Sequence, residues 1–176
     1  MKILKSAAPL AILAGATLAG CSSDKTGDCP TITGITDASV VTMFKPGSTP
    51  DPSNVVFTLE LTHVNGKCDM GKKERSADAS LEIGFLATRP PSGVEAHYTF
   101  PYFVAVTEGS DRILVKQTYS VAIAFAPGQT STSITDNINS THLEVAKGKH
   151  PYDYQILAGL QLSKSQLDYN RQHYAQ

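Results

Sequence analysis

The chain has 176 residues, of which 41% are hydrophobic and 18% charged, and its 15 lysine and arginine residues nearly balance 16 aspartate and glutamate residues. This balance offers no basic surface of the kind that nucleic acid binding requires, so we expect no nucleic acid partner. The length suits one domain that buries its own core.

The first twenty residues have the organisation of a secretory signal peptide. Lys2 and Lys5 precede thirteen mostly small and aliphatic residues, 7–19, a run too short to cross a bilayer as a helix. The run ends in Leu18-Ala19-Gly20-Cys21. This ending resembles the lipobox of bacterial lipoproteins. The resemblance implies that residues 1–20 are removed and that the Cys21 thiol receives a diacylglycerol. It also implies that the freed amine of Cys21 receives a further acyl chain such as palmitate, and that lipid tethers the mature protein to a membrane.

Without residues 1–20 the chain would keep 156 residues, with 13 basic against 16 acidic ones and a net charge of −3. This charge argues against a polybasic membrane contact beyond the lipid. Residues 22–28, SSDKTGD, are small and polar and show no apolar periodicity. The lipidated segment 21–28 is therefore predicted to be a flexible tether, followed by a single domain at residues 29–176.

The residue after the lipidated cysteine bears on location. In the sorting rule known from enteric bacteria, an aspartate at this position retains a lipoprotein at the inner membrane, and Ser22 stands there in this chain. The resemblance implies the outer membrane, facing the periplasm, with the inner membrane as the alternative. The mature part carries Cys29-Pro30, FPYFVAV at 100–106 and QLDYNR at 166–171. In these features it is similar to uncharacterised lipoproteins of Gram-negative bacteria, which brings no known activity.

Two cysteines remain once Cys21 is assigned to lipid. In an oxidising compartment Cys29 and Cys68 are expected to form a disulfide, with two buried free thiols as the alternative. Neither lies in a CxxC motif, so thiol-disulfide exchange chemistry is not expected.

Apolar residues alternate with polar ones along most of the mature chain, which is typical of strands with one buried face. Five segments show this clearly and two more weakly: 54–64, 80–88, 98–106, 113–125 and 152–162, then 32–44 and 130–138. The predicted inward residues include Val55, Phe57, Leu59, Leu61, Leu81, Ile83, Phe85, Ala87, Tyr98, Phe100, Tyr102, Val104, Val106, Ile113, Val115, Tyr119, Val121, Ile123, Phe125, Tyr152, Tyr154, Ile156, Ala158, Leu160 and Leu162.

Turn residues separate these segments, at 65–66, 90–93, 108–111, 127–128 and 148–151. Their spacing predicts an antiparallel meander, in which 108–111 closes a hairpin. About seven strands of this kind predict an all-β fold, an immunoglobulin-like antiparallel β-sandwich, with a barrel as the alternative.

The C-terminal segment predicts a short α-helix that ends near Tyr174. Ser163 is a good N-cap, and Gln166 can complete a capping box three residues later. Leu162 and Leu167 occupy the positions of a hydrophobic staple. We expect this helix to pack across an edge or an end of the sandwich, or alternatively to be offered to a partner.

The chain carries no recognisable catalytic or metal motif. Its five histidines have no pair at metal-ligand spacing, no GxSxG is present, and its aspartates do not follow the calcium-loop pattern. We therefore expect no catalytic residues, no metal and no cofactor, and a protein that is not an enzyme.

The segment 98–104 is rich in aromatic residues. Alternation would point Phe103 away from the core, and Pro101 cannot donate to a strand ladder, so the strand is expected at a sheet edge or kinked. Pro101 and Phe103 are therefore the candidate surface for a partner that adds a strand. The alternative is that the C-terminal helix or a loop covers Phe103.

Two functions follow from these features. The first is a lipid-anchored, non-catalytic module of the bacterial envelope that binds or scaffolds another envelope protein. The alternative is a carrier or enzyme that acts on a small envelope lipid or cell-wall fragment. That second function would need a deep cavity, lined by residues such as Tyr98, Tyr102, Tyr119 or Tyr154.

Overall fold

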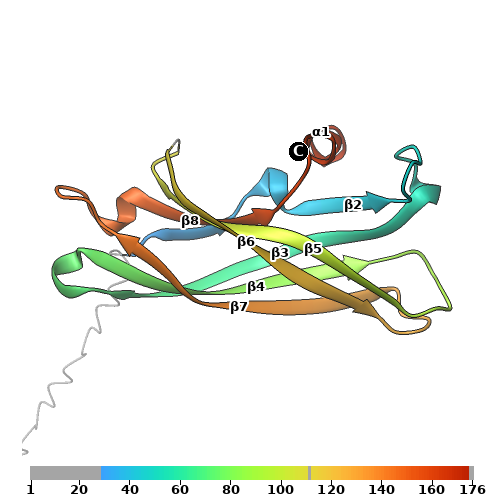
Figure 1. Cartoon of the computed structure of the whole chain (residues 1–176), viewed down its shortest axis with the longest axis horizontal. Coiled ribbons are helices and arrows are strands. Elements are labelled where there is room, and N and C mark those ends of the chain that lie inside the picture. Colours follow the sequence, from blue (N-terminus) through green and yellow to red (C-terminus); the bar gives the residue numbers. More distant parts are fainter. Residues whose placement is uncertain (1–28, 111, 175–176) are drawn as a thin grey trace, which may run out of the picture.

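The computed structural model describes residues 29–110 and 112–174 (Figure 1). The predicted signal peptide, Cys21 and the tether 22–28 lie outside the described residues. The strands are β1 (Thr31–Gly34), β2 (Val40–Phe44), β3 (Val55–Met70), β4 (Ser76–Thr88), β5 (Ala96–Glu108), β6 (Arg112–Phe125), β7 (Ser131–Glu144) and β8 (Tyr154–Leu160). The helices are the 3-10 turns η1 (Thr36–Ala38), η2 (Pro52–Asn54), η3 (Lys72–Glu74) and η4 (Pro151–Asp153), and the α-helix α1 (Lys164–His173).

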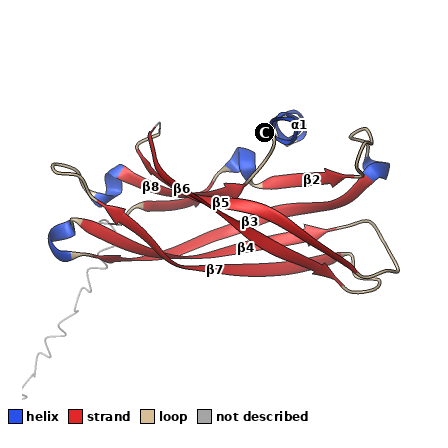
Figure 2. Cartoon of the chain, in the orientation of Figure 1, coloured by secondary structure: helices blue, strands red, loops and turns tan. Residues whose placement is uncertain are grey.

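Two four-stranded sheets pack face to face, as the alternation predicts (Figure 2). One sheet has the order β1-β8-β5-β6 and the other β2-β3-β4-β7. All neighbouring strands are antiparallel except β1 and β8, which are parallel. The β-sandwich is confirmed, with eight strands in place of about seven. The simple meander is wrong, because the chain passes between the sheets after β1, β4, β6 and β7, which sets β7 beside β4 and β8 beside β5.

The core lies between the two sheets and consists of the inward residues of each strand. Most of the predicted inward residues are buried, because the pleat sends alternate side chains to the same face. The largest fully buried side chains are Tyr102, Tyr154, Phe85, Phe125, Leu59, Ile83, Ile123, Ile156, Leu160, Val41, Val106 and Val121. Three predictions of burial are wrong: Ile113, Val115 and Tyr152 are exposed.

The predicted turn at Asn65-Gly66 is also wrong, since both residues lie inside β3, which continues to Met70. The reason is pairing with β4, which continues through this point with Asn65 opposite Glu82 and Gly66 opposite Leu81. A Cβ built on Gly66 would lie 2.3 Å from Cδ1 of Ile32 in β1, so the absent side chain leaves room for Ile32 to pack over β3. Glycine here serves a close approach between strands.

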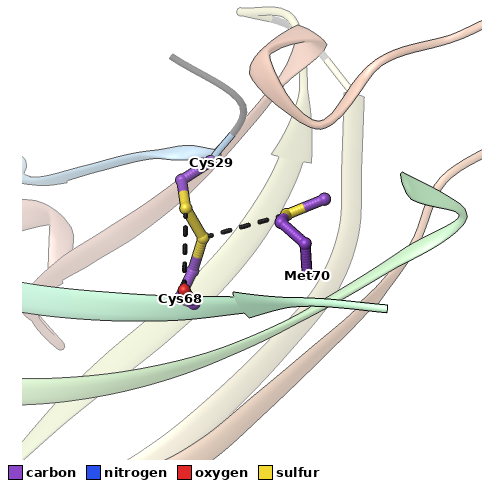
Figure 3. Close-up of a disulfide and its surroundings, with 3 residues drawn as sticks. All are labelled: Cys29, Cys68 and Met70. Carbon is purple, nitrogen blue, oxygen red and sulfur yellow. Dashed lines mark hydrogen bonds between the residues drawn. A yellow bond between two sulfur atoms is a disulfide. The ribbon is translucent and has the colours of Figure 1, made fainter. Parts of the chain in front are cut away.

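The disulfide between Cys29 and Cys68 is present and joins the start of the domain to β3 (Figure 3). The two Cα atoms are 6.1 Å apart. Met70 lies beside the bridge, its sulfur 3.9 Å from that of Cys68. Since β1 and β3 belong to different sheets, the bridge ties the N-terminal end of one sheet to the other.

The helix α1 has the predicted capping box, in which the Ser163 side chain accepts from the Gln166 N–H and the Gln166 side chain accepts from the Ser163 N–H. It packs across β2, the edge strand of the second sheet (Figure 1). Asn170 donates to the backbone there, and the hydroxyls of Tyr174 and Thr42 are 3.1 Å apart. The prediction that the helix covers an edge is confirmed.

Candidate functional site

The predicted partner surface, Pro101 and Phe103, is not at a sheet edge. Both residues lie in β5, which is paired on one side with β6 and on the other with β8. Proline is tolerated at this position because the backbone N–H that it lacks would lie beside the end of β8, where the pairing of the two strands stops. The Pro101 carbonyl accepts from the N–H of Gln161, which is the first residue after β8. The expectation of an edge strand is therefore wrong.

Phe103 points to the outer face of its sheet, as the alternation predicts, but its neighbours cover it in part. The Lys116 ammonium lies 4.0 Å from the centre of the Phe103 ring. On the neighbouring strand, a Cβ built on Gly159 would lie 3.1 Å from Phe103 Cζ and also from Ala38 Cβ. The ring is thus half-buried among β6, β8 and η1, which makes it a poor docking surface.

An exposed strand edge lies instead at the start of β6. Ile113, Leu114 and Val115 are 63%, 38% and 54% exposed, in three successive positions. β6 pairs with β5 on one side and is the last strand of its sheet on the other. The backbone groups of β6 that face outward are therefore free to bind another strand, next to a cluster of large aliphatic side chains.

A β-bulge shapes this edge. Val115 pairs with Val106 and Ile113 with Thr107, so Leu114 has no partner in β5. Bulges are frequent at sheet edges and beside functional sites, where they redirect side chains. After the bulge the ladder is regular from Val115 through Thr118, and these residues are exposed as well.

The other three edges are covered, short or polar. The helix α1 crosses β2 and covers it (Figure 1), and β1 has only four residues. The edge strand β7 is long, but its sequence STSITDNINSTHLE has few large apolar side chains, and a register shift interrupts its pairing with β4. Polar side chains and irregular pairing protect an edge from unwanted association. In the described part of the chain, β6 is the edge with consecutive exposed aliphatic residues.

The two sheets diverge beside this edge, because β6 and β7 meet at one end of the sandwich and separate toward the other (Figure 1). Between the two sheets, Tyr102 in β5 donates a hydrogen bond of 2.6 Å to Asp136 in β7. Tyr119 of β6 stacks on Tyr102, with ring centres 5.4 Å apart. Burial and the nearby Asp136 carboxylate raise the pKa of both tyrosines above the ordinary value, so both stay neutral.

The four tyrosines named for a ligand cavity fill the core instead. Tyr102 and Tyr154 are fully buried, and the Tyr154 hydroxyl accepts from the N–H of Ala146. Tyr98 and Tyr119 are half-buried and pack on aromatic neighbours, Tyr98 on Phe57 and Phe125. These contacts are those of packed side chains, which satisfy one another and the backbone.

Within residues 29–110 and 112–174, no three histidine, cysteine, aspartate or glutamate side chains are grouped as a metal ion would require. Three of the histidines lie on the surface beside a carboxylate, for example His142 with Asp78 at 2.8 Å. Single pairs of this kind are ordinary surface contacts.

No helix among the described residues is long and apolar enough to cross a membrane. Comparison of the chain with protein-family models, with characterised proteins and with solved structures finds no match. The candidate site therefore depends on the geometry of β6 alone. Sequence reasoning missed this edge because the alternation placed Ile113 and Val115 in the core. The signal that could have found it is the run Ile113-Leu114-Val115, since three successive apolar residues cannot all face the core in a strand whose side chains alternate.

Proposed function

We propose that the protein is a lipid-anchored, non-catalytic module of the bacterial envelope that binds a partner protein by strand addition to β6. The observation that supports this function is the β6 edge, where Ile113, Leu114 and Val115 are exposed beside unpaired backbone groups. A partner strand would pair with residues 115–118 and cover the aliphatic side chains. Burial of such side chains stabilises a complex by about 25 cal/mol per Å² of apolar surface, before the cost of association is subtracted.

The anchor is proposed from the lipobox at Cys21. Labelling of cells with radioactive palmitate tests it directly: we expect the label on the native protein and not on Cys21→Ser. Label on Cys21→Ser would contradict the lipid anchor. The Cys29→Ser variant is the matched control, because it removes a different cysteine from the same chain and should keep the label.

Location in the outer membrane is proposed from Ser22. We expect Ser22→Asp to move the protein from the outer-membrane to the inner-membrane fraction on a density gradient, whereas Ser22→Thr should leave it in place. Equal distribution of both variants with the native protein would contradict the sorting proposal.

Site-specific crosslinking in intact cells tests the partner surface. A photoreactive amino acid at Leu114 should give a reproducible adduct with another envelope protein, which mass spectrometry identifies. The same probe at Thr135, an exposed residue of the β7 edge, should not give that adduct. The same adduct from both positions, a self-adduct alone, or no reproducible adduct would contradict strand addition at β6.

A second substitution tests the apolar character of the site. Val115→Lys should abolish the adduct of the Leu114 probe by placing a charge where the partner buries a side chain. Val94→Lys is the matched control, since Val94 is 66% exposed in a loop at the other end of β5. An unchanged adduct in Val115→Lys would count against the proposal.

A further inference from the structure

Two loops form one tip of the sandwich, at the left end in Figure 1. They are the β3–β4 loop, residues 71–75, and the β7–β8 loop, residues 145–149. The N–H of Val145 donates to the carbonyl of Arg75 at 2.9 Å, which holds the two loops together. A depression of about 310 Å³ lies between them.

The side chains of this tip are predominantly basic. Its exposed basic residues, which we call the basic tip, are Lys72, Lys73, Arg75, Lys147 and Lys149. Lys149 pairs with Glu108 at 3.2 Å. The other four form no ion pair with another described residue, so they remain available to an anionic partner.

Nearby carboxylates offset this charge only in part. Glu108 is shared between Lys149 and Arg112, and Asp78 lies 2.8 Å from His142. Asp69 and Glu144 are exposed and lie at the ends of β3 and β7. Glu74 belongs to the β3–β4 loop itself, so the two loops together hold five basic residues against one acidic residue. The small net charge of the chain therefore conceals a local excess of positive charge at the tip.

The basic tip is also the end of the domain closest to the proposed lipid anchor. Cys29 is bonded to Cys68, four residues before Lys72. Residues 22–28 can span at most about 25 Å, whereas the 16 residues of β3 extend over about 50 Å. An anchor at Cys21 thus keeps the membrane near this end of the sandwich and out of reach of the opposite end.

An exposed aromatic residue lies in the same loop region. Tyr152 in η4 is 55% exposed, and its ring stacks on His150 with the centres 4.8 Å apart. Tyrosine is enriched where proteins meet the membrane–water interface, since its ring is apolar and its hydroxyl is polar.

From these observations we infer that the basic tip binds the phosphate-bearing headgroups of anionic lipids and holds the domain against the membrane in a fixed orientation. The nearness of the basic tip to the membrane rests on the proposed lipid anchor at Cys21. Basic side chains close to an anionic surface attract it, and each strengthens binding about fivefold. In this orientation the acyl chain supplies the attachment, and the basic tip determines which end of the sandwich faces the lipid.

Vesicle binding by a chain without acyl groups tests the inference separately from the anchor. The protein is the mature chain from residue 21 with Cys21→Ser, which retains the whole described core and the disulfide. It is mixed with vesicles of phosphatidylcholine alone or of phosphatidylcholine with phosphatidylglycerol, and co-sedimentation is measured at low and high salt. We expect binding to the anionic vesicles only, and its loss at high salt.

The backbone of Lys73 offers a variant that should not harm folding. Lys73 has a φ of 59°, in the left-handed region that favours glycine, so Lys73→Gly removes the charge and relieves strain. We expect Lys73→Gly/Lys147→Gln to bind anionic vesicles about 25-fold more weakly, at about fivefold for each lysine. Lys45→Gln/Lys164→Gln, which removes two exposed lysines outside the tip, should bind like the parent chain.

Three results would overturn the inference: equal binding to both kinds of vesicle, binding that salt does not weaken, or equal losses in the two double variants. The salt dependence of the parent chain needs no variant, so misfolding of a variant cannot hide the answer. Palmitate labelling reports on the anchor alone and crosslinking at Leu114 on β6 alone, which makes failure of the basic tip distinguishable from failure of the proposed function.

Discussion

The side-chain amide of Asn170 donates a hydrogen bond of 2.6 Å to the carbonyl of Val40, on the edge strand β2. A second, longer bond of 3.3 Å reaches the carbonyl of Asp37. Asn170 is buried although it is polar, so α1 satisfies edge carbonyls that would otherwise face outward. The chain thus covers the β2 edge with its own helix and leaves the β6 edge open, which is the asymmetry on which the proposed function depends.

Loss of this contact should destabilise the fold. We expect Asn170→Ala to lower the free energy of unfolding by about 1–2 kcal/mol, since it removes the donor to Val40. Asn170→Asp should cost more, because it replaces the donor by a carboxylate oxygen that faces a carbonyl oxygen. Urea unfolding measures both. Asn139→Ala, at an exposed asparagine of β7, is the matched control and should change stability little. An unchanged midpoint in Asn170→Asp would contradict the role of the amide.

The disulfide should contribute a large share of the stability. Cys29 and Cys68 are separated by 39 residues, and the chain-entropy model predicts a stabilisation of about 4 kcal/mol for a closed loop of about 40 residues. We expect Cys29→Ser/Cys68→Ser to lose about this amount in urea unfolding without reductant. Cys21→Ser in the same mature chain should be unaffected. Alkylation of both cysteines without prior reduction, detected by mass mapping, would show that the bridge is not formed.

The buried Tyr102 should make the fold sensitive to alkaline pH. Burial raises the pKa of Tyr102 above the value of a tyrosine in the unfolded chain, and the hydrogen bond to Asp136 raises it further. Below about pH 10 the tyrosine is protonated in both states and its contribution is complete. Above that pH the unfolded state ionises first, so stability falls as pH rises.

Unfolding by urea at neutral and alkaline pH measures this effect. Tyr102→Phe should be less stable than the parent at neutral pH by about 1.5–3 kcal/mol, because Asp136 loses a donor, and its stability should fall less steeply above pH 10. Tyr152→Phe, at an exposed tyrosine, is the control and should keep the parental slope. The same slope in Tyr102→Phe as in the parent would refute the assignment.

The sequence predicts the sheets correctly where apolar residues recur at every second position, because this spacing matches the alternating faces of a strand. It placed most buried residues of β3, β4, β5 and β8 on the inner face, and it located the helix with its capping box. It failed at Val115 because alternation reports which face a residue occupies and not whether the opposite sheet covers that face. It failed at Ile113 because the bulge breaks the alternation and sets Ile113 opposite Thr107, on the other face from Val115. Near these residues the two sheets diverge, which is a property of their packing.

The candidate surfaces were harder to predict, because each depends on residues far apart in the chain. Pro101 lacks an N–H wherever it lies, and only the end of β8 beside it explains why an inner strand accepts it. The basic tip joins residues 71–75 to 145–149, which share no pattern in sequence. Asn65-Gly66 has turn chemistry, but its pairing with β4 keeps it extended, and Ile32 of β1 packs where a side chain on Gly66 would lie.

That contact gives a last prediction. Gly66→Ala should destabilise the fold by about 1 kcal/mol or more, since the added methyl meets Ile32 Cδ1 at 2.3 Å and Ile32 Cγ2 at 3.1 Å. Ile32→Ala makes room for the methyl but loses apolar burial, so it should be destabilising alone. Combined, the two substitutions should cost less than the sum of the single ones, as a double-mutant cycle of urea unfolding would measure. Gly93→Ala, where an added Cβ would meet nothing within 4 Å, is the control for the glycine change. Strictly additive costs would contradict the close packing of Ile32 against Gly66.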